Sequence, residues 1–324
     1  MSTILITGAA GFIGSHVSEA LLRQGHTVVG VDNLNDFYPE VIKRRNVAEV
    51  RAAVPGAPFI LCEGDLRDLP WLEGVFAAHA PAAVIHLAAY AGVRPSIEQP
   101  LLYTQVNIDG TMNVLECMRK QGTARLCFAS SSSVYGNNPV VPFSEQQAVD
   151  RPISPYAATK KAGEVLCYAH HHLFGLRVAC LRFFTVYGPR QRPDLAIHKF
   201  TRLIEAGEPV PFFGDGSMRR DHTYIADIVD GVLRALAWTD SDAPRYDIFN
   251  LGESRTISLT ELVEAIAQAL GKQPVLQRLP AQPGDVQQTY ADITHAREVL
   301  GYHPSTELAD GLAQFVRWYR AVNP

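Results

Sequence analysis

This chain of 324 residues has few cysteines, no long apolar run and no excess of basic residues. Its 5 cysteines are odd in number, widely spaced and without a C-x-x-C pair. This usage is typical of buried, reduced thiols, so a disulfide framework is not expected. No stretch comes near the roughly 18 consecutive apolar residues that a membrane-spanning helix needs, so such a helix is not expected either.

The charge balance excludes a second group of functions. The 29 Lys and Arg side chains against 33 Asp and Glu leave a formal net charge of −4, with no long basic run. A nucleic acid or an anionic membrane is therefore not the expected partner. Residues 1–10 lack the cationic start and apolar core of a secretory signal, so we expect a cytoplasmic protein.

What the chain does contain is a regular alternation of short apolar runs with longer helical patterns. The runs are β-branched or almost continuously apolar, which favours a parallel sheet that helices cover on both faces. Seven strands are predicted, at Thr3–Thr7, Thr27–Val31, Pro58–Cys62, Ala83–Leu87, Ala124–Ala129, Arg177–Arg182 and Tyr246–Asn250.

Local signals also bound a long helix and a domain change. Ser154–Pro155 opens the helix with an N-cap acceptor and a proline, and Gly175 ends it. Beyond Arg182, proline and glycine become more frequent and the helical patterns shorten. We therefore predict an α/β fold with a doubly wound parallel sheet in residues 1–180, to which segments around 218–250 return. A smaller mixed domain is expected in residues 181–324.

The predicted sheet also locates the binding site, because ligands of open parallel sheets lie beyond the carboxyl ends of the strands. Glycine-rich, polar or charged residues follow each of the first six predicted strands. These segments are Gly8–Gly14, Asp32–Asn33, Gly64–Asp65, Ala88–Arg94, Ser130–Ser133 and Phe183–Arg192.

The first of these segments has the pattern G-x-x-G-x-x-G between a strand and a helix. Gly8 allows a tight turn, Gly11 lets a pyrophosphate approach the backbone, and Gly14 lets helix and strand pack closely. Asp32 ends the second strand, where its carboxylate would accept bonds from ribose hydroxyls and repel a 2′-phosphate. This favours NAD over NADP; a purely structural glycine turn is the alternative.

Asp65 is expected to accept a bond from the adenine amino group, or else to be a solvated turn residue. The full set of expected contacts to NAD is Gly8, Gly11, Phe12, Ile13, Gly14, Asp32, Asn33, Asp65, Leu66, Leu87, Ala88, Ala89, Tyr156 and Lys160.

Tyr156 and Lys160 lie four residues apart on one predicted helix, hence on the same face. A phenol is a poor base at its reference pKa of about 10. A nearby ammonium and a positive nicotinamide both favour its phenolate form. The serine run ends an apolar strand 25 residues earlier, so Ser131 or Ser132 would bond the same substrate oxygen. We expect these four residues to be catalytic.

No metal site is predicted. His170, His171 and His172 are consecutive on the expected helix. Their side chains would therefore point about 100° apart and could not converge on one ion.

Taken together, the glycine motif, Asp32, the serine run before V-Y-G, and Tyr156-x-x-x-Lys160 resemble the extended short-chain dehydrogenase/reductase family over nearly the whole chain. The resemblance implies a Rossmann domain that holds NAD tightly, a smaller domain for a nucleotide sugar, and a homodimer. It further implies that Tyr156 takes the proton of the sugar 4-hydroxyl as C4 is oxidised. The 4-keto sugar then turns over and is reduced on its other face.

Two positions narrow the reaction. Dehydratases and decarboxylases of this family usually carry an acid just before V-Y-G, where this chain has Ser132 and Ser133. Epimerisation needs no such acid, so it is the favoured reaction.

The segment Arg182–Asp194, R-F-F-T-V-Y-G-P-R-Q-R-P-D, resembles the UDP-glucuronate 4-epimerases of the family. A uronate carboxylate needs charge-assisted partners, and an arginine fork suits it. We expect Arg192 to hold it together with Thr185 and Ser133; contact with the UDP phosphates or between domains is the alternative role of Arg192.

By the same resemblance, Arg220 binds the diphosphate and Asp285 the uridine ribose. Gln282 stands where glucose-type members often carry an arginine, so Arg94 and Arg220 would supply more of the positive charge. Three alternatives stay open. They are a UDP-glucose or UDP-N-acetylglucosamine 4-epimerase, a UDP-glucuronate decarboxylase, and a non-catalytic NAD-binding protein.

Overall fold

The computed structural model describes residues 1–280 and 287–323, which form two compact units. The first unit comprises residues 1–136, 148–182 and 229–249, and the second comprises 137–147, 183–228 and 250–324. The sequence prediction drew its main boundary at 180 and left residues 137–147 in the first domain.

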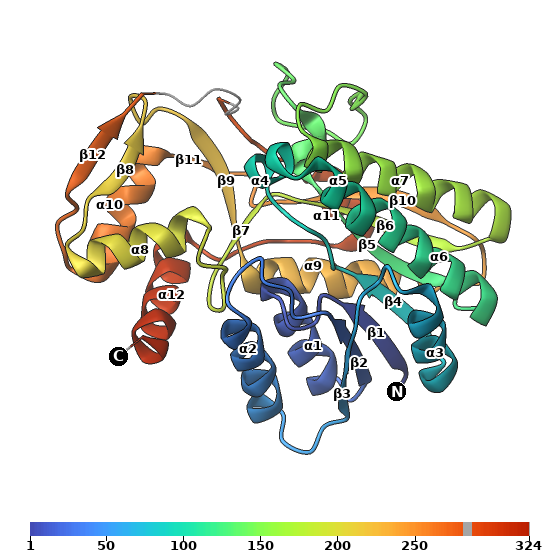
Figure 1. Ribbon diagram of the computed structural model, residues 1–324. Coiled ribbons are helices and arrows are strands. Elements are labelled where there is room, and N and C mark those ends of the chain that lie inside the picture. Colours follow the sequence, from blue (N-terminus) through green and yellow to red (C-terminus); the bar gives the residue numbers. More distant parts are fainter. Residues whose placement is uncertain (281–286, 324) are drawn as a thin grey trace. The chain divides into compact units, whose positions relative to one another are not determined.

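The first unit is built on a seven-stranded sheet of order β10-β6-β5-β4-β1-β2-β3 (Figure 1). Along the part of the sheet that runs β5-β4-β1-β2-β3, neighbouring strands are parallel. Ile6 of β1, for example, lies between Gly30 of β2 and Ile85 of β4. The predicted α/β class is therefore confirmed. The strands are β1 Thr3–Thr7, β2 Thr27–Asp32, β3 Phe59–Glu63, β4 Ala83–His86, β5 Arg125–Ser131, β6 Arg177–Phe183 and β10 Tyr246–Leu251. All seven predicted strands are present, and no end differs from its predicted position by more than two residues.

Helices of the first unit cover the sheet because their apolar sides bury against the strands. They are α1 Phe12–Arg23, α2 Glu40–Ala53, α3 Leu69–His79, α4 Val93–Glu98, α5 Pro100–Thr104, α6 Gly110–Gln121 and α7 Pro155–Phe174. Leu72 of α3, Val114 of α6 and Cys167 of α7 share one buried cluster with Leu5 and Leu126 of the strands. The three helices therefore lie on the same face, and α1 packs against α2 (Figure 1).

The long helix α7 begins and ends where the sequence predicts. Ser154 accepts a hydrogen bond from the backbone N–H of Ala157, and Gly175 ends the helix with a left-handed φ of +70°. Gly163 lets α7 approach β5 closely, since a Cβ there would lie 2.2 Å from Cζ of Phe128.

The second unit holds two small sheets. One has the order β11-β9-β7, with β9 antiparallel to β11 and parallel to β7, and the other pairs β12 with β8. The strands are β7 Thr185–Tyr187, β8 Val210–Phe213, β9 Arg219–Tyr224, β11 Thr256–Ser258 and β12 Leu276–Leu279. The helices are α8 Ala196–Ala206, α10 Leu259–Leu270, α11 Thr294–Leu300 and α12 Leu308–Val322, while α9, Ile225–Trp238, contributes to both units.

None of the described helices combines the length and the apolar character that crossing a bilayer requires.

Candidate active site

The turn after β1 is shaped by its glycines. Gly8 has a φ of +72°, and a Cβ there would lie 2.9 Å from the backbone nitrogen of Ala88. A Cβ on Gly14 would lie 2.1 Å from the carbonyl oxygen of Gly8. Gly11 is the N-cap of α1 and offers no side-chain acceptor, so the first N–H groups of that helix are available to an anion. The turn fits a dinucleotide pyrophosphate.

Asp32 joins this turn to the chain after β2. Its Oδ2 accepts the N–H of Ala10 at 3.0 Å, and its Oδ1 accepts the N–H of Leu34 at 2.9 Å. Burial raises the pKa of the Asp32 carboxyl, against the opposing effect of the Leu34 N–H and of the Lys43 charge. The carboxylate thus sits at the edge of the sheet where a ribose is expected.

Asp65 follows β3 and has partners of its own. Its carboxylate accepts bonds from Nε and the terminal nitrogen of Arg67 at 2.9 and 2.8 Å, and from Nδ2 of Asn33 at 3.0 Å. The Arg67 side chain holds the pKa of Asp65 at about 2. The neighbouring Leu66 is buried, and its carbonyl accepts a bond from Asn113.

The remaining predicted cofactor residues cluster at the same sheet edge. Phe12 and Ile13 are the first residues of α1. Leu87, Ala88 and Ala89 follow β4, with the N–H groups of Leu87 and Ala88 bonded to the backbone and side chain of Thr7. The structure therefore brings together the segments that follow β1, β2, β3 and β4.

Lys160 is buried beside Tyr156 on α7. Its Nζ donates to the carbonyl of Ala129 at 2.7 Å and lies 6.0 Å from the centre of the Tyr156 ring. Burial lowers the pKa of Lys160 to about 8. The Tyr156 ring packs edge-on against Tyr103, whose hydroxyl donates to the carbonyl of Ala91.

The serine run stands at the carboxyl end of β5, as the sequence predicts. Ser130 and Ser131 are the last two residues of β5, and both are buried. Ser132 and Ser133 open a 3-10 turn, Ser132–Tyr135. The hydroxyl oxygen of Ser131 accepts the N–H of Ser133, and the hydroxyl donates to that of Ser133, both at 3.2 Å. The serines are thus held in ordered backbone.

Two buried residues had no place in the sequence prediction. Asn107 lies in a π-helical turn, Gln105–Asp109, and bonds both the N–H and the carbonyl of Tyr90 as well as the hydroxyl of Thr159. It thereby ties the loop after β4 to α7 beside Lys160. No periodicity signals such a turn.

His86 is the second of these residues. Its ring nitrogens contact the hydroxyls of Thr7 at 2.6 Å and Thr111 at 2.9 Å. Burial lowers its pKa to about 3, and the Lys160 charge acts in the same direction. A neutral imidazole thus links β1, β4 and α6.

The predicted substrate residues divide between the two units. Arg94 lies in α4 and Ser133 in the 3-10 turn of the first unit. In the second unit Thr185 begins β7 and pairs with His222. Arg220 lies in β9 opposite Ile257. Asp285 falls outside the described residues.

Arg192 already holds a carboxylate. Its Nε and one terminal nitrogen donate to the two oxygens of Asp194 at 3.0 and 2.8 Å. Such a bidentate pair is the geometry by which arginine recognises carboxylates.

Two of the three consecutive histidines of α7 make contacts within the local structure. His170 contacts the carbonyl of Leu166 and the carboxylate of Glu116, while His171 contacts the carbonyl of Leu176.

These features define a class, an α/β enzyme with a dinucleotide turn and a helix that carries Tyr156 beside a buried Lys160. Comparison with known proteins identifies its family. Residues 4–252 match the NAD dependent epimerase/dehydratase family, and the chain belongs to it. The resemblance in the sequence is confirmed. The protein is an isomerase with NAD as its cofactor, as predicted.

Individual relatives agree with this assignment. The chain is 42% identical to a UDP-glucuronate 4-epimerase of Thermodesulfobacterium geofontis over 98% of its length and 96% of the relative. The UDP-glucuronic acid 4-epimerase of Bacillus cereus, solved with UDP-glucuronic acid and NAD, is 34% identical with a TM-score of 0.89, covering 99% of both chains. The UDP-glucose 4-epimerase of Thermotoga maritima, solved with UDP-glucose, is 33% identical with the same TM-score, covering 99% of this chain and 100% of that one.

Proposed function

We propose that this enzyme is a UDP-sugar 4-epimerase whose substrate is UDP-glucuronate, which it interconverts with UDP-galacturonate. One observation carries the choice of a uronate: Arg192 grips a carboxylate, that of Asp194, through two parallel hydrogen bonds. A substrate carboxylate would replace Asp194 at the same guanidinium. The 42% identity to a UDP-glucuronate 4-epimerase supports this proposal.

NAD would be held by Gly8, Gly11, Gly14 and Asp32, and when bound it supplies reversible oxidation at the sugar C4. Tyr156 would take the proton from the 4-hydroxyl and return it after the keto sugar has turned. Lys160 supplies positive charge beside the phenol, with its Nζ 6.0 Å from the ring centre. Ser131 or Ser132 would donate to the same sugar oxygen and hold it in place.

The absence of an acid at positions 132 and 133 supports epimerisation over dehydration. Both residues are serine and lie in ordered backbone at the end of β5. A 4-keto uronate is a β-keto acid, which loses carbon dioxide readily unless its carboxylate is held. The expected holders are Arg192, Thr185 and Ser133. This retention separates the proposed reaction from that of a decarboxylase.

Steady-state rates on two substrates test the proposal. We expect kcat/KM to be higher for UDP-glucuronate than for UDP-glucose. Arg192→Ala should lower the value for UDP-glucuronate by about 10- to 100-fold, as expected for lost charge-assisted hydrogen bonds, and that for UDP-glucose by less than about threefold.

The matched control is Arg202→Ala. Arg202 is an exposed arginine of the same unit and pairs with Glu208. The Arg202→Ala variant should have the parent's kcat/KM for both substrates. If Arg192→Ala lowers kcat/KM equally for both substrates, Arg192 has another role and the glucose-type alternative gains support.

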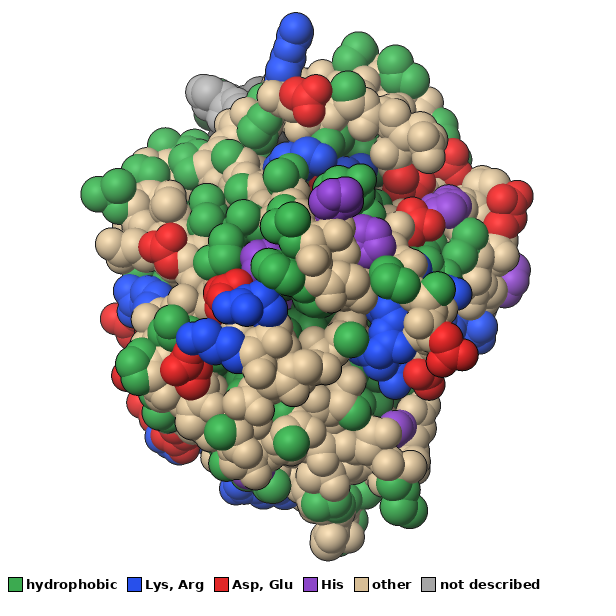
Figure 2. Space-filling model, turned by 90° about the vertical axis from the view of Figure 1, so that its right-hand side faces the viewer, with side chains coloured by type: hydrophobic (Ala, Val, Ile, Leu, Met, Phe, Trp, Pro, Cys, Tyr) green, Lys and Arg blue, Asp and Glu red, His purple; other side chains and the backbone are tan. Residues whose placement is uncertain are grey.

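We also propose that the protein forms a homodimer. Four large apolar side chains of α7 are exposed: Val165, Tyr168, Leu173 and Phe174. Figure 2 shows the side that lies to the right in Figure 1, where apolar side chains are scattered among acidic, basic and other polar ones. Sedimentation equilibrium should give twice the chain mass, and Leu173→Glu should shift the protein toward the monomer.

A further inference from the structure

A buried ion pair joins α7 to β6 one helical turn from Lys160. Glu164 lies one helical turn after Lys160, and Arg182 lies near the end of β6; each side chain is 1% exposed. Nε and a terminal nitrogen of Arg182 donate to Oε1 and Oε2 of Glu164 at 2.8 and 2.9 Å. A pair buried so completely is stable only when the remaining polar atoms also find partners.

Those remaining partners flank the serine segment, which we define as Ser131–Ser133. The hydroxyl of Ser130, immediately before the segment, donates to Oε1 of Glu164 at 2.6 Å. The other terminal nitrogen of Arg182 donates to the hydroxyl of Tyr135, two residues after the segment, at 3.0 Å. The ion pair therefore holds both ends of the serine segment.

The same helix carries the other half of the catalytic set. Tyr156, Lys160 and Glu164 are spaced four residues apart and lie on one face of α7. Lys160 donates to the carbonyl of Ala129, directly before Ser130. Two successive turns of the helix thus hold adjacent residues of β5.

We propose that Glu164 and Arg182 are positioning residues for catalysis: they fix the serine segment at a set distance from Tyr156. The phenol and a serine hydroxyl must meet at one sugar oxygen, and neither the serine segment nor the helix alone sets their separation. This proposal rests on the proposed epimerase chemistry but is independent of which UDP-sugar is turned over.

The competing explanation is that the pair only stabilises the fold. Ser130→Ala and Tyr135→Phe separate the two explanations, since each releases one end of the segment while Glu164 and Arg182 remain paired. Tyr135→Phe also keeps the ring, which lies 4.9 Å from the Arg182 guanidinium.

The experiment measures kcat, KM and bound NAD for these variants, using whichever UDP-sugar the parent converts. We expect kcat to fall by about 10- to 100-fold, as for a small misplacement of reacting groups, while KM and NAD content stay within about twofold. The same two substitutions should also be made in the double variant Ser131→Ala, Ser132→Ala. There, adding Ser130→Ala or Tyr135→Phe should lower kcat by less than about threefold relative to the double variant, because the hydroxyls to be positioned are absent.

Two controls account for effects on stability and charge. Val114→Ala weakens the core cluster on α6 without touching the segment, and Lys161→Met removes the more exposed cation that contacts Glu164. Both should leave kcat unchanged. The proposal is overturned if Ser130→Ala and Tyr135→Phe keep kcat within about threefold of the parent, or if their effects multiply fully with loss of the serines.

Discussion

Lys160 lies one turn after Tyr156 on α7, with its ammonium nitrogen 6.0 Å from the centre of the phenol ring and bonded to the carbonyl of Ala129. The ammonium is buried and has no carboxylate among its described partners. Because no ion pair neutralises it, the Lys160 charge acts on the nearby phenol and favours its phenolate form. This relationship underlies the first two predictions.

Tyr156→Phe should lower kcat by about 100- to 10,000-fold, because the variant has no group to take or return the sugar proton. Bound NAD should be retained, since the ring still packs against Tyr103. Rates and NAD content of the purified variant check this. Activity within a few-fold of the parent would instead support the non-catalytic alternative.

The activity should decline as pH rises through about 8, the value to which burial lowers the pKa of Lys160. Above that pH the lysine is neutral and no longer favours the phenolate. A pH profile of kcat in the parent and in Lys160→Met should show this alkaline limb only in the parent. A parent profile that is flat up to about pH 10 would contradict the role given to Lys160.

The same titration has a consequence for stability. Between about pH 8 and about pH 10.4, the unfolded chain keeps a proton on Lys160 that the folded chain has lost. The contribution of Lys160 to the free energy of unfolding should therefore rise with pH in this window and stay constant below it. Denaturant titrations at about pH 7 and pH 9.5 should show a smaller rise for Lys160→Met than for the parent.

Asp32→Asn should weaken NAD binding by about tenfold and narrow the preference for NAD over NADP. The two carboxylate oxygens of Asp32 accept the N–H groups of Ala10 and Leu34. The amide of the variant has only one acceptor oxygen, so one of these two hydrogen bonds is lost. Asp230→Asn is the control, since Asp230 pairs with Arg234 at an exposed site on α9. Calorimetric titration with both cofactors measures the effect; an unchanged preference would contradict the role of Asp32.

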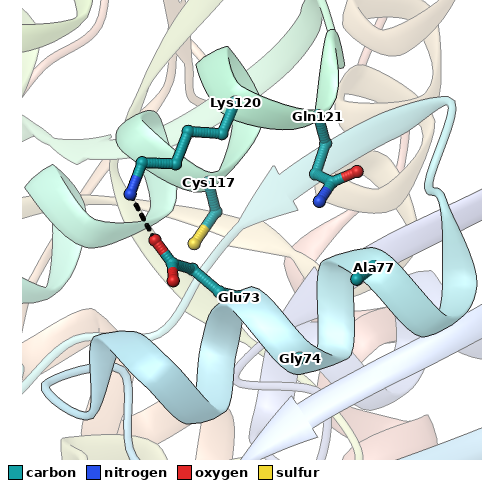
Figure 3. A pocket seen from close by; sticks show the side chains of 6 residues that line it. All are labelled: Glu73, Gly74, Ala77, Cys117, Lys120 and Gln121. Carbon is teal, nitrogen blue, oxygen red and sulfur yellow. Dashed lines mark hydrogen bonds and ion pairs between the residues drawn. The ribbon is translucent and has the colours of Figure 1, made fainter.

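Gly163→Ala should destabilise the protein by about 1–3 kcal/mol, because the new Cβ would overlap the Phe128 ring and force α7 away from β5. The matched control is Gly74→Ala. Gly74 lies in α3 and lines a pocket between α3 and α6, where Glu73 pairs with Lys120 beside Cys117 (Figure 3).

A Cβ at Gly74 meets nothing within 4 Å. Gly74→Ala should therefore stabilise the protein by about 0.5–1 kcal/mol through helix propensity. Thermal unfolding of both variants checks the pair of predictions. Equal effects of the two substitutions would show that the contact between α7 and β5 is not as close as described.

Much of the first unit could be predicted from local sequence. Strands such as Thr3–Thr7 and Ala83–His86 are almost continuously apolar, and α7 carries its own start and stop signals in Ser154 and Gly175. Asp32 was identifiable because the dinucleotide turn fixes where a ribose-binding carboxylate must follow.

Features that depend on distant partners could not be predicted. The pairing of Glu164 with Arg182 joins residues from a helix and a strand, and neither position differs locally from an ordinary charged residue. The predicted strand ended at Ala129, because the serines that follow it are polar, whereas β5 extends to Ser131. Residues 137–147 join the second unit through the bridge between Phe143 and Ala291, which no local pattern indicates.

The central claim, C4 epimerisation of a uronate that keeps its carboxylate, is tested most directly by identifying the product. The purified enzyme would be incubated with UDP-glucuronate, the nucleotide sugars followed by proton NMR and released carbon dioxide measured. We predict UDP-galacturonate approaching an equilibrium mixture, with no carbon dioxide. A UDP-pentose with stoichiometric carbon dioxide, or conversion of UDP-glucose while UDP-glucuronate stays unchanged, would contradict the account.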